Sequence, residues 1–334
     1  MTVASLRKDD FAMDQQVDPP ADAAVAVEAV KSAPSRRLLP ASIKLPSGRA
    51  LFDSLWPPVV GILSFLGLWA LLAPMVKTSL GTLPGPGDVW DAFKGLMVEY
   101  SAARVAAAEA VASGSTYTGP PTFIDQIFTS LETVAMGFTL ATLVAVPLGL
   151  VAGMSKRINA AINPLVQILK PISPLAWLPI VTMVVSASIT SDDPALPKSF
   201  VISAVVVMLC SLWPTLINTA VGTASIDKDL LNVGRVLRLG WFARLTKLVL
   251  PSSLPYIFTG MRLSLGVGWM VLIAAEMLAQ NPGLGKFVWD EFQNGNEKSL
   301  ARIMVAVVVI GLIGFMLDRI MMALQAVASR NHTL

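Results

Sequence analysis

Long apolar runs alternate with short polar segments through most of this chain. Six runs stand out, and each is close to or above the ~20 residues that an α-helix needs to cross ~30 Å of hydrocarbon. They lie at 57–76, 127–154, 164–188, 199–221, 254–278 and 300–324. The pattern predicts an all-α, polytopic integral membrane protein with six transmembrane helices.

Composition agrees with this prediction and narrows the chemistry. Of the 334 residues, 54% are hydrophobic and 14% are charged, whereas a soluble domain is about 25% charged. Cys210 is the single cysteine and His332 the single histidine, so a disulfide framework within the chain is excluded and a metal site built from these residues is disfavoured. We expect no metal, no cofactor and no nucleic-acid partner.

The distribution of Lys and Arg predicts the orientation in the membrane. Lys156, Arg157 and the basic residues of 224–251 fall on the same side as the Lys- and Arg-containing tail 1–50, while the opposite loops are richer in Asp and Glu. Because short cytoplasmic loops carry the excess of Lys and Arg, both termini are predicted to be cytoplasmic. Membrane lipid then surrounds the spans.

The same pass along the chain suggests four parts. We expect a disordered cytoplasmic tail at 1–50, a first span with a long outer loop at 51–125, a membrane core at 126–326 and a C-terminal tail at 327–334. In the outer loop, Trp90, Phe93, Met97 and Tyr100 recur at helical spacing. That helix either lies along the membrane or over the first span, or it receives a partner protein.

The segment 224–251, between the fourth and fifth spans, is amphipathic and basic. Charges such as Asp227, Arg235 and Lys247 would be costly in hydrocarbon, so this segment must fold on one side of the membrane. Two short helices are expected, the first capped by Ser225 or Asp227 and the second beginning after Gly240. From the pattern alone, the loop either contacts a soluble partner or rests on anionic lipid.

At this point the chain resembles the permease subunits of ATP-binding-cassette importers of the nitrate, sulfonate and taurine group. Those permeases carry a cytoplasmic loop of the form E-A-A-x3-G-x9-I-x-L-P. Here Asn232, Val233 and Gly234 stand at the E-A-A positions, Arg238 stands at the glycine, and Leu248, Leu250 and Pro251 end the pattern. The segments LPGPGDVWDAF, SLETVAMGFTLATLVAVPLGLVAGMS, KPISPLAWLPIV and LPYIFTGMRLSLGVGWMVLIAAEML are similar to the same group. SLWPTLINT and NVGRVLRLG are most similar to its nitrate and bicarbonate branches.

The resemblance implies a type I importer-like transmembrane domain in a bacterial inner membrane. It implies ATPase subunits, a second permease subunit (a homodimer is expected) and a periplasmic or lipid-anchored substrate-binding protein. The expected substrate is a small anion, nitrate first, with nitrite or cyanate possible and bicarbonate, taurine or aliphatic sulfonates as alternatives. The ATPase-coupling residues would be Asp229, Leu230, Leu231, Asn232, Val233, Gly234, Arg235, Arg238, Leu239 and Gly240.

The spans themselves offer a few candidates for the translocation path. The prolines of 170–179 prevent a regular helix, and broken backbone persists in a membrane only where protein or water satisfies it. Arg262 and Glu276 are charges within an apolar run, so each should face a partner or water. Arg262 is expected near the cytoplasmic end of its span, either in an ion pair or on an anion. The candidate path residues are Lys170, Pro174, Trp177, Pro179, Arg262, Trp269 and Glu276.

Gly149 and Gly153 form a G-x-x-x-G of the kind used in close helix packing.

Other features of the sequence argue against alternative functions. GLGK at 283–286 lacks the earlier glycine and the hydroxyl of a phosphate-binding loop, so ATP hydrolysis is expected on a partner and not on this chain. An intramembrane enzyme lacks a catalytic constellation here. A secondary transporter is the nearer alternative, but it would not need the basic loop.

Overall fold

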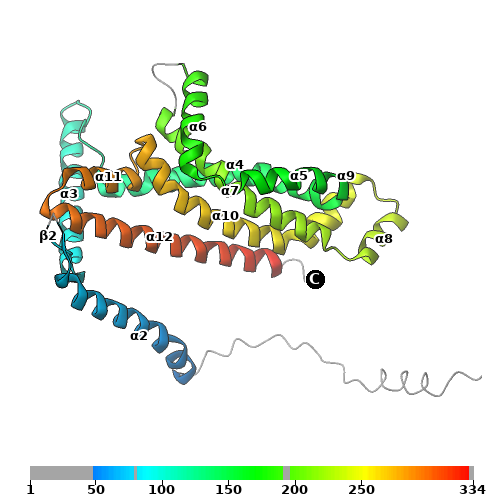
Figure 1. The fold of residues 1–334 in the computed structure, drawn as a ribbon, viewed down its shortest axis with the longest axis horizontal. Helices are drawn as coiled ribbons and strands as arrows, with labels where there is room; N and C mark the ends of the chain where they lie inside the picture. The colour runs from blue at the N-terminus through cyan, green and yellow to red at the C-terminus, as the bar shows by residue number, and fades with distance from the viewer. Residues whose placement is uncertain (1–47, 79–80, 191–195, 331–334) are drawn as a thin grey trace, which may run out of the picture. The chain divides into compact units, whose positions relative to one another are not determined.

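The computed structural model describes residues 48–78, 81–190 and 196–330, and most of them are helical (Figure 1). The tail expected at 1–50 lies outside these residues except for its last three positions. Contacts divide the chain into two units between Gly61 and Ile62, inside helix α2 (Gly48–Leu72). The following description concerns the unit that begins at Ile62.

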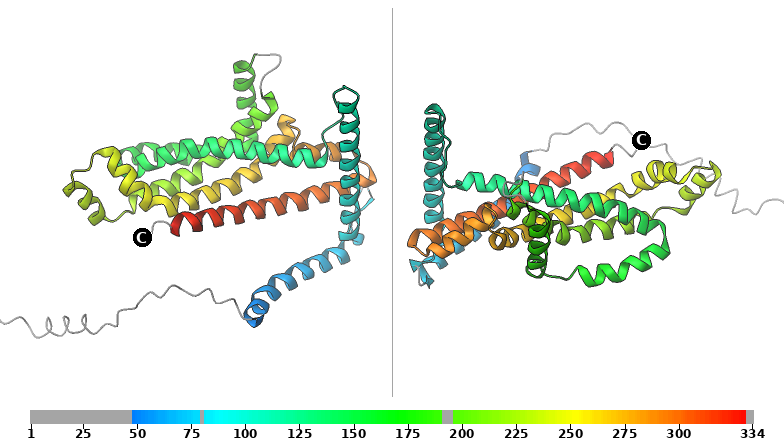
Figure 2. Two further views of the ribbon diagram at one scale, coloured as in Figure 1. Left: turned by 180° about the vertical axis from the view of Figure 1, so that it is seen from behind. Right: turned by 90° about the horizontal axis from the view of Figure 1, so that it is seen from above.

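A short connection and one long helix follow α2. The connection contains a 3-10 turn, η1 (Ala73–Met75), and two paired strands, β1 (Lys77–Thr78) and β2 (Gly81–Thr82). Helix α3 (Pro86–Ala112) begins where the Asp88 carboxylate accepts a hydrogen bond from the Gly85 amide at 2.8 Å. The helix expected in the outer loop is therefore confirmed. It contacts α4 and α12 and runs across the long helices near one end of them (Figures 1 and 2).

Four long helices form the core, and their packing order follows from their contacts. Helices α4 (Phe123–Met154), α7 (Lys198–Ala224) and α10 (Leu250–Ala279) pack together, and α12 (Glu297–Arg330) packs on α10. The short helix α11 (Leu284–Asn294) joins α10 to α12. Five helices of the described residues are long and apolar enough to cross a membrane, and a bent pair would make a sixth.

Helices α4 and α7 run in the same direction, and glycines let them approach closely. A Cβ built on Gly137 would meet Ala204 and Val207, whereas one on Gly149 would meet Leu216 and Thr219. Residue numbers therefore rise together along both helices. Two parallel spans need the intervening chain to return across the membrane, so the bent pair between them counts as the third crossing.

The third span was expected at 164–188, with prolines that prevent a regular helix. It consists of α5 (Lys156–Leu169) and α6 (Pro174–Ser188), which are bent by 101° relative to each other. Pro171 and Pro174 stand at the break, and neither can donate a backbone hydrogen bond. The prolines were read correctly as a disruption, but the separation into two helices of different direction was not foreseen.

A proline also lies within α7, and a neighbouring helix contacts the residue after it. Pro214 lacks an N–H, and the next amide, that of Thr215, donates to the Ser264 hydroxyl of α10 at 3.0 Å. The Thr215 hydroxyl donates to the same oxygen at 2.7 Å. These buried contacts satisfy polar groups that lipid could not, and they fix α10 against α7.

Candidate functional site

The basic loop folds into three short helical segments between α7 and α10. They are α8 (Lys228–Val236), α9 (Trp241–Arg244) and the π-helical η2 (Leu245–Val249), which continues into α10. Of the two expected caps, Asp227 is the one used, because its carboxylate accepts from the Asp229 amide at 2.9 Å. Asp229, Leu230, Leu231, Asn232, Val233, Gly234 and Arg235 lie in α8, and Arg238, Leu239 and Gly240 lie in the turn after it.

Arg238 has an unusual backbone conformation at the end of α8. Its φ of 50° lies in the left-handed region, which costs most residues roughly 1–2 kcal/mol and glycine very little. The amide of Leu239 donates to the Gly234 carbonyl at 3.0 Å and closes the turn. Arg238 is also the position at which the importer loop pattern has glycine, so the backbone supports that alignment.

Gly234 packs against the segment that follows the turn. A Cβ built there would lie 2.7 Å from Cδ1 of Leu248, so the glycine lets α8 lie against η2. The apolar side chains that remain open lie elsewhere on the loop. They are Val233, Val236, Leu237, Trp241 and Phe242, which are 50–82% exposed.

The candidates at 170–179 lie at the bend between α5 and α6. Lys170 is the C-terminal cap of α5 and is exposed, and Pro174 begins α6. Pro179 is exposed, whereas Trp177 is partly buried with an indole N–H that finds no acceptor in the described part of the chain. Helices α6 and α10 contact each other, but in the described part of the chain no hydrogen bond or ion pair joins these four residues to the candidates on α10.

The candidates on α10 divide into two groups. Arg262 lies about 18 Å from the start of α10 at 1.5 Å per residue. Its Nε and Nη2 donate to the two carboxylate oxygens of Asp318 on α12, at 2.5 and 3.0 Å. Trp269 lies two turns further along the same face of α10. It is buried and donates from Nε1 to the Ile310 carbonyl at 3.0 Å.

Glu276 belongs to a separate and fully buried network. The Ser130 hydroxyl of α4 lies 2.9 and 2.8 Å from its two carboxylate oxygens, and the Gly285 amide donates at 3.0 Å. The Leu284 amide donates to the Ser130 oxygen at 2.8 Å. The carboxylate thus sits at the N-terminus of α11, where amide donors and the helix dipole favour negative charge. It joins α4, α10 and α11.

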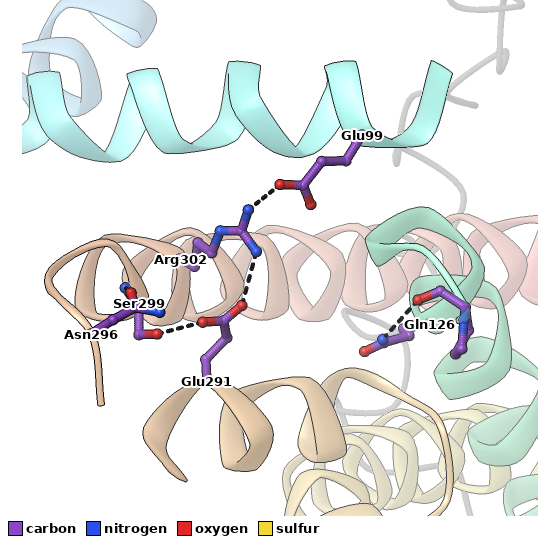
Figure 3. A network of polar contacts seen from close by, with 7 residues as sticks. Glu99, Gln126, Glu291, Asn296, Ser299 and Arg302 are labelled. Carbon is purple, nitrogen blue, oxygen red and sulfur yellow. Dashed lines mark hydrogen bonds and ion pairs between the residues drawn. The ribbon is translucent and has the colours of Figure 1, made fainter. Parts of the chain in front are cut away.

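A second ionic network was missed in the sequence. Arg302 of α12 donates to Glu291 of α11 at 3.1 Å and forms an ion pair with Glu99 of α3 (Figure 3). The Ser299 hydroxyl donates to the other oxygen of Glu291 at 2.7 Å. A groove of about 680 Å³ adjoins this cluster, and Gln126 also lines it. A signal was available, because Arg302 stands inside the predicted span 300–324.

Helix α3 has a second attachment to the spans through Arg104. Its guanidinium donates from Nε to the Tyr100 hydroxyl at 3.1 Å, and this hydrogen bond raises the pKa of Arg104 above its ordinary value. The same side chain lies 3.7 Å from Asp125 at the start of α4. Tyr100 belongs to α3 itself, so the contact with Asp125 is the one that joins α3 to α4.

Long apolar helices, charges paired within them and a folded polar loop together define an all-α polytopic membrane protein. Residues 145–330 match the family of binding-protein-dependent transport system inner membrane components. The chain belongs to this family of transport permeases. The resemblance noted in the sequence and the predicted type I importer-like, multi-pass fold are thereby confirmed.

Individual relatives are similar over different lengths. The bicarbonate transport system permease protein CmpB of Synechococcus elongatus is 35% identical over 86% of this chain and 95% of its own length. The nitrate import permease protein NrtB of the same species is 38% identical over 58% of this chain and 66% of its own. A solved structure of the MetNI methionine ABC transporter, inward facing, is 15% identical and covers 60% of this chain and 95% of its own, with a TM-score of 0.49.

Proposed function

We propose that this chain is the permease subunit of an ATP-driven importer for a small inorganic oxyanion, with nitrate as the first candidate. The observation that carries this proposal is the 35–38% identity to permeases named for bicarbonate and for nitrate transport. The two anions are alike in shape and charge, since both are planar and monovalent. A translocation path with few charged residues suits such a substrate, because a single cation can compensate the charge of the anion. A site that binds the anion weakly also releases it easily.

Bicarbonate is the second candidate, and one observation favours it. The similarity to the bicarbonate permease extends over 86% of this chain, whereas that to the nitrate permease extends over 58%. Nitrate remains the first candidate because the segments SLWPTLINT and NVGRVLRLG resemble nitrate permeases as well as bicarbonate permeases. Nitrite and cyanate remain further candidates of the same size, whereas taurine and alkanesulfonates are larger.

In the proposed complex, two copies of the chain pair in a bacterial inner membrane and bind two ATPase subunits through α8 and the turn after it. Support comes from the exposed apolar side chains of this loop and from the match of Arg238 to the family's glycine position. Closure of the ATPases on ATP would push on the loop, and η2 would pass that movement to α10. A periplasmic or lipid-anchored binding protein would deliver the anion from outside.

The path itself is proposed to involve Lys170, Pro174, Trp177, Pro179, Arg262 and Trp269. The broken helices at 170–179 are consistent with contact to water. Glu276 is better suited to a structural role, because both of its carboxylate oxygens already accept hydrogen bonds from protein groups.

The test is uptake of isotope-labelled nitrate and bicarbonate in cells that carry the whole transport system, with and without this chain. Nitrate uptake that needs this chain, and that nitrite inhibits more than taurine does, is the expected result. Stronger inhibition by taurine would refute the substrate assignment. Uptake that persists after deletion of the ATPase subunit would instead favour a secondary transporter.

A further inference from the structure

We infer that Arg262 is a transient binding site for the transported oxyanion, and that Asp318 keeps this site weak. The inference rests on the proposed function, since it assigns one residue of the path to the anion. It begins from the way in which the guanidinium is used. Arg262 has five N–H donors, and Asp318 accepts two of them, from Nε and Nη2.

The remaining donors of Arg262 form a second binding edge. Both hydrogens of Nη1 and the second hydrogen of Nη2 have no acceptor among the residues that the structure describes. The planar guanidinium presents Nη1 and Nη2 as a fork that matches two oxygens of a carboxylate or a similar oxyanion. Nitrate and bicarbonate each have two oxygens in this arrangement.

The space around the ion pair is open enough for such an anion. Two hollows of about 230 and 570 Å³ share Arg262, Gly266 and Asp318 in their linings. A water molecule occupies about 30 Å³ in the liquid, so either hollow has room for a small oxyanion. Gly266 leaves part of this space free, because a Cβ built there would meet nothing within 4 Å.

This face of α10 is also unsuited to lipid. The side chains of Arg262 and Asp318 are 39% and 34% exposed, although both lie within long apolar helices, where a charge facing lipid is costly. One turn toward the basic loop, the Gln325 amide of α12 donates to the Thr259 hydroxyl at 3.3 Å. Polar groups therefore continue from Arg262 along the seam between α10 and α12 toward the end from which the loop emerges.

Asp318 explains why binding at this seam would be weak. The ion pair is neutral, so a bound oxyanion would leave the site with one net negative charge. The carboxylate also occupies the other edge of the guanidinium. Removing its charge should strengthen anion binding and slow release, whereas removing Arg262 should abolish binding at this position.

The decisive variant replaces the ion pair by an apolar pair, Arg262→Met with Asp318→Leu. An apolar pair of similar size often preserves stability, so the complex should assemble while kcat/KM for the labelled anion falls about tenfold to a hundredfold. The matched control is Arg319→Gln, which removes the neighbouring cation that stacks on Phe315 and should leave uptake unchanged. An assembled double variant with normal kcat/KM would overturn the inference.

A second variant decides the question if the double variant does not assemble. Asp318→Asn should lower both the apparent KM and the maximal rate, because the freed guanidinium holds the anion longer. An unchanged or higher KM would refute the inference. The measurement uses whichever labelled anion the unaltered system carries. If it carries none of nitrate, bicarbonate, nitrite and cyanate, the proposed function fails. If the unaltered system carries one of them and the variants carry it equally well, only the role of Arg262 is refuted.

Discussion

Substitution of Gly149 by alanine examines the close approach of α4 and α7. A Cβ at this position would lie 2.6 Å from Thr219 Cβ and 2.8 Å from the Leu216 carbonyl oxygen. Ordinary contacts begin at about 3.4 Å. The carbonyl belongs to a helix and cannot turn aside as a flexible side chain would, so the two helices must move apart.

The size of the effect follows from that movement. A gap of about 0.5–1 Å forfeits a quarter to a half of the dispersion energy of the atoms that line it, and overpacking of a well-packed core costs about 1–3 kcal/mol. Helices α4 and α7 make one of the two most extensive contacts in the described structure, so this loss affects the centre of the fold. We expect Gly149→Ala to destabilise the protein by about 1–3 kcal/mol.

The assay is thermal unfolding of the purified protein in detergent, followed by intrinsic tryptophan fluorescence. Gly311→Ala is the matched control, because it makes the same change in α12 at a position where an added Cβ would meet nothing within 4 Å. The first variant should unfold at a lower temperature and the control at the original temperature or above it. Equal unfolding temperatures for the two variants would refute the packing argument.

Two further predictions concern the loop and the topology. Arg238→Gly should raise the unfolding temperature and preserve uptake, because glycine relieves about 1–2 kcal/mol of left-handed strain. Arg238→Val should lower the unfolding temperature and reduce uptake. A higher unfolding temperature for the valine variant than for the glycine variant would contradict the alignment of this position with the family's glycine. A cysteine at Asn294 should react with an impermeant thiol reagent in intact cells, and one at Ser225 should not; the opposite labelling would invert the proposed orientation.

Most of the spans were predictable because their signal is local. The run expected at 199–221 became α7 (Lys198–Ala224), and that at 254–278 became α10 (Leu250–Ala279). Twenty apolar residues in a row need no information from the rest of the chain to be recognised. The 101° bend of the third span is different, since prolines mark a break but the direction after it depends on the neighbouring helices.

In the candidate site, individual residues could be recognised from the sequence, but the pairs that they form could not. Arg262 and Glu276 stood out because charge is rare in an apolar run. Their partners, Asp318 and Ser130, are 56 and 146 residues away in sequence, and no local pattern connects them. The conformation of Arg238 was likewise hidden, because an arginine gives no sign that its backbone is left-handed.

Helix α10 has a mechanical consequence that its sequence alone does not reveal. At 1.5 Å per residue its 30 residues form a rod about 45 Å long. Its first turn continues from η2, and its last turns are tied through Glu276 to α4 and α11. A tilt imposed at the loop would therefore bear on α4 and α11 through Glu276.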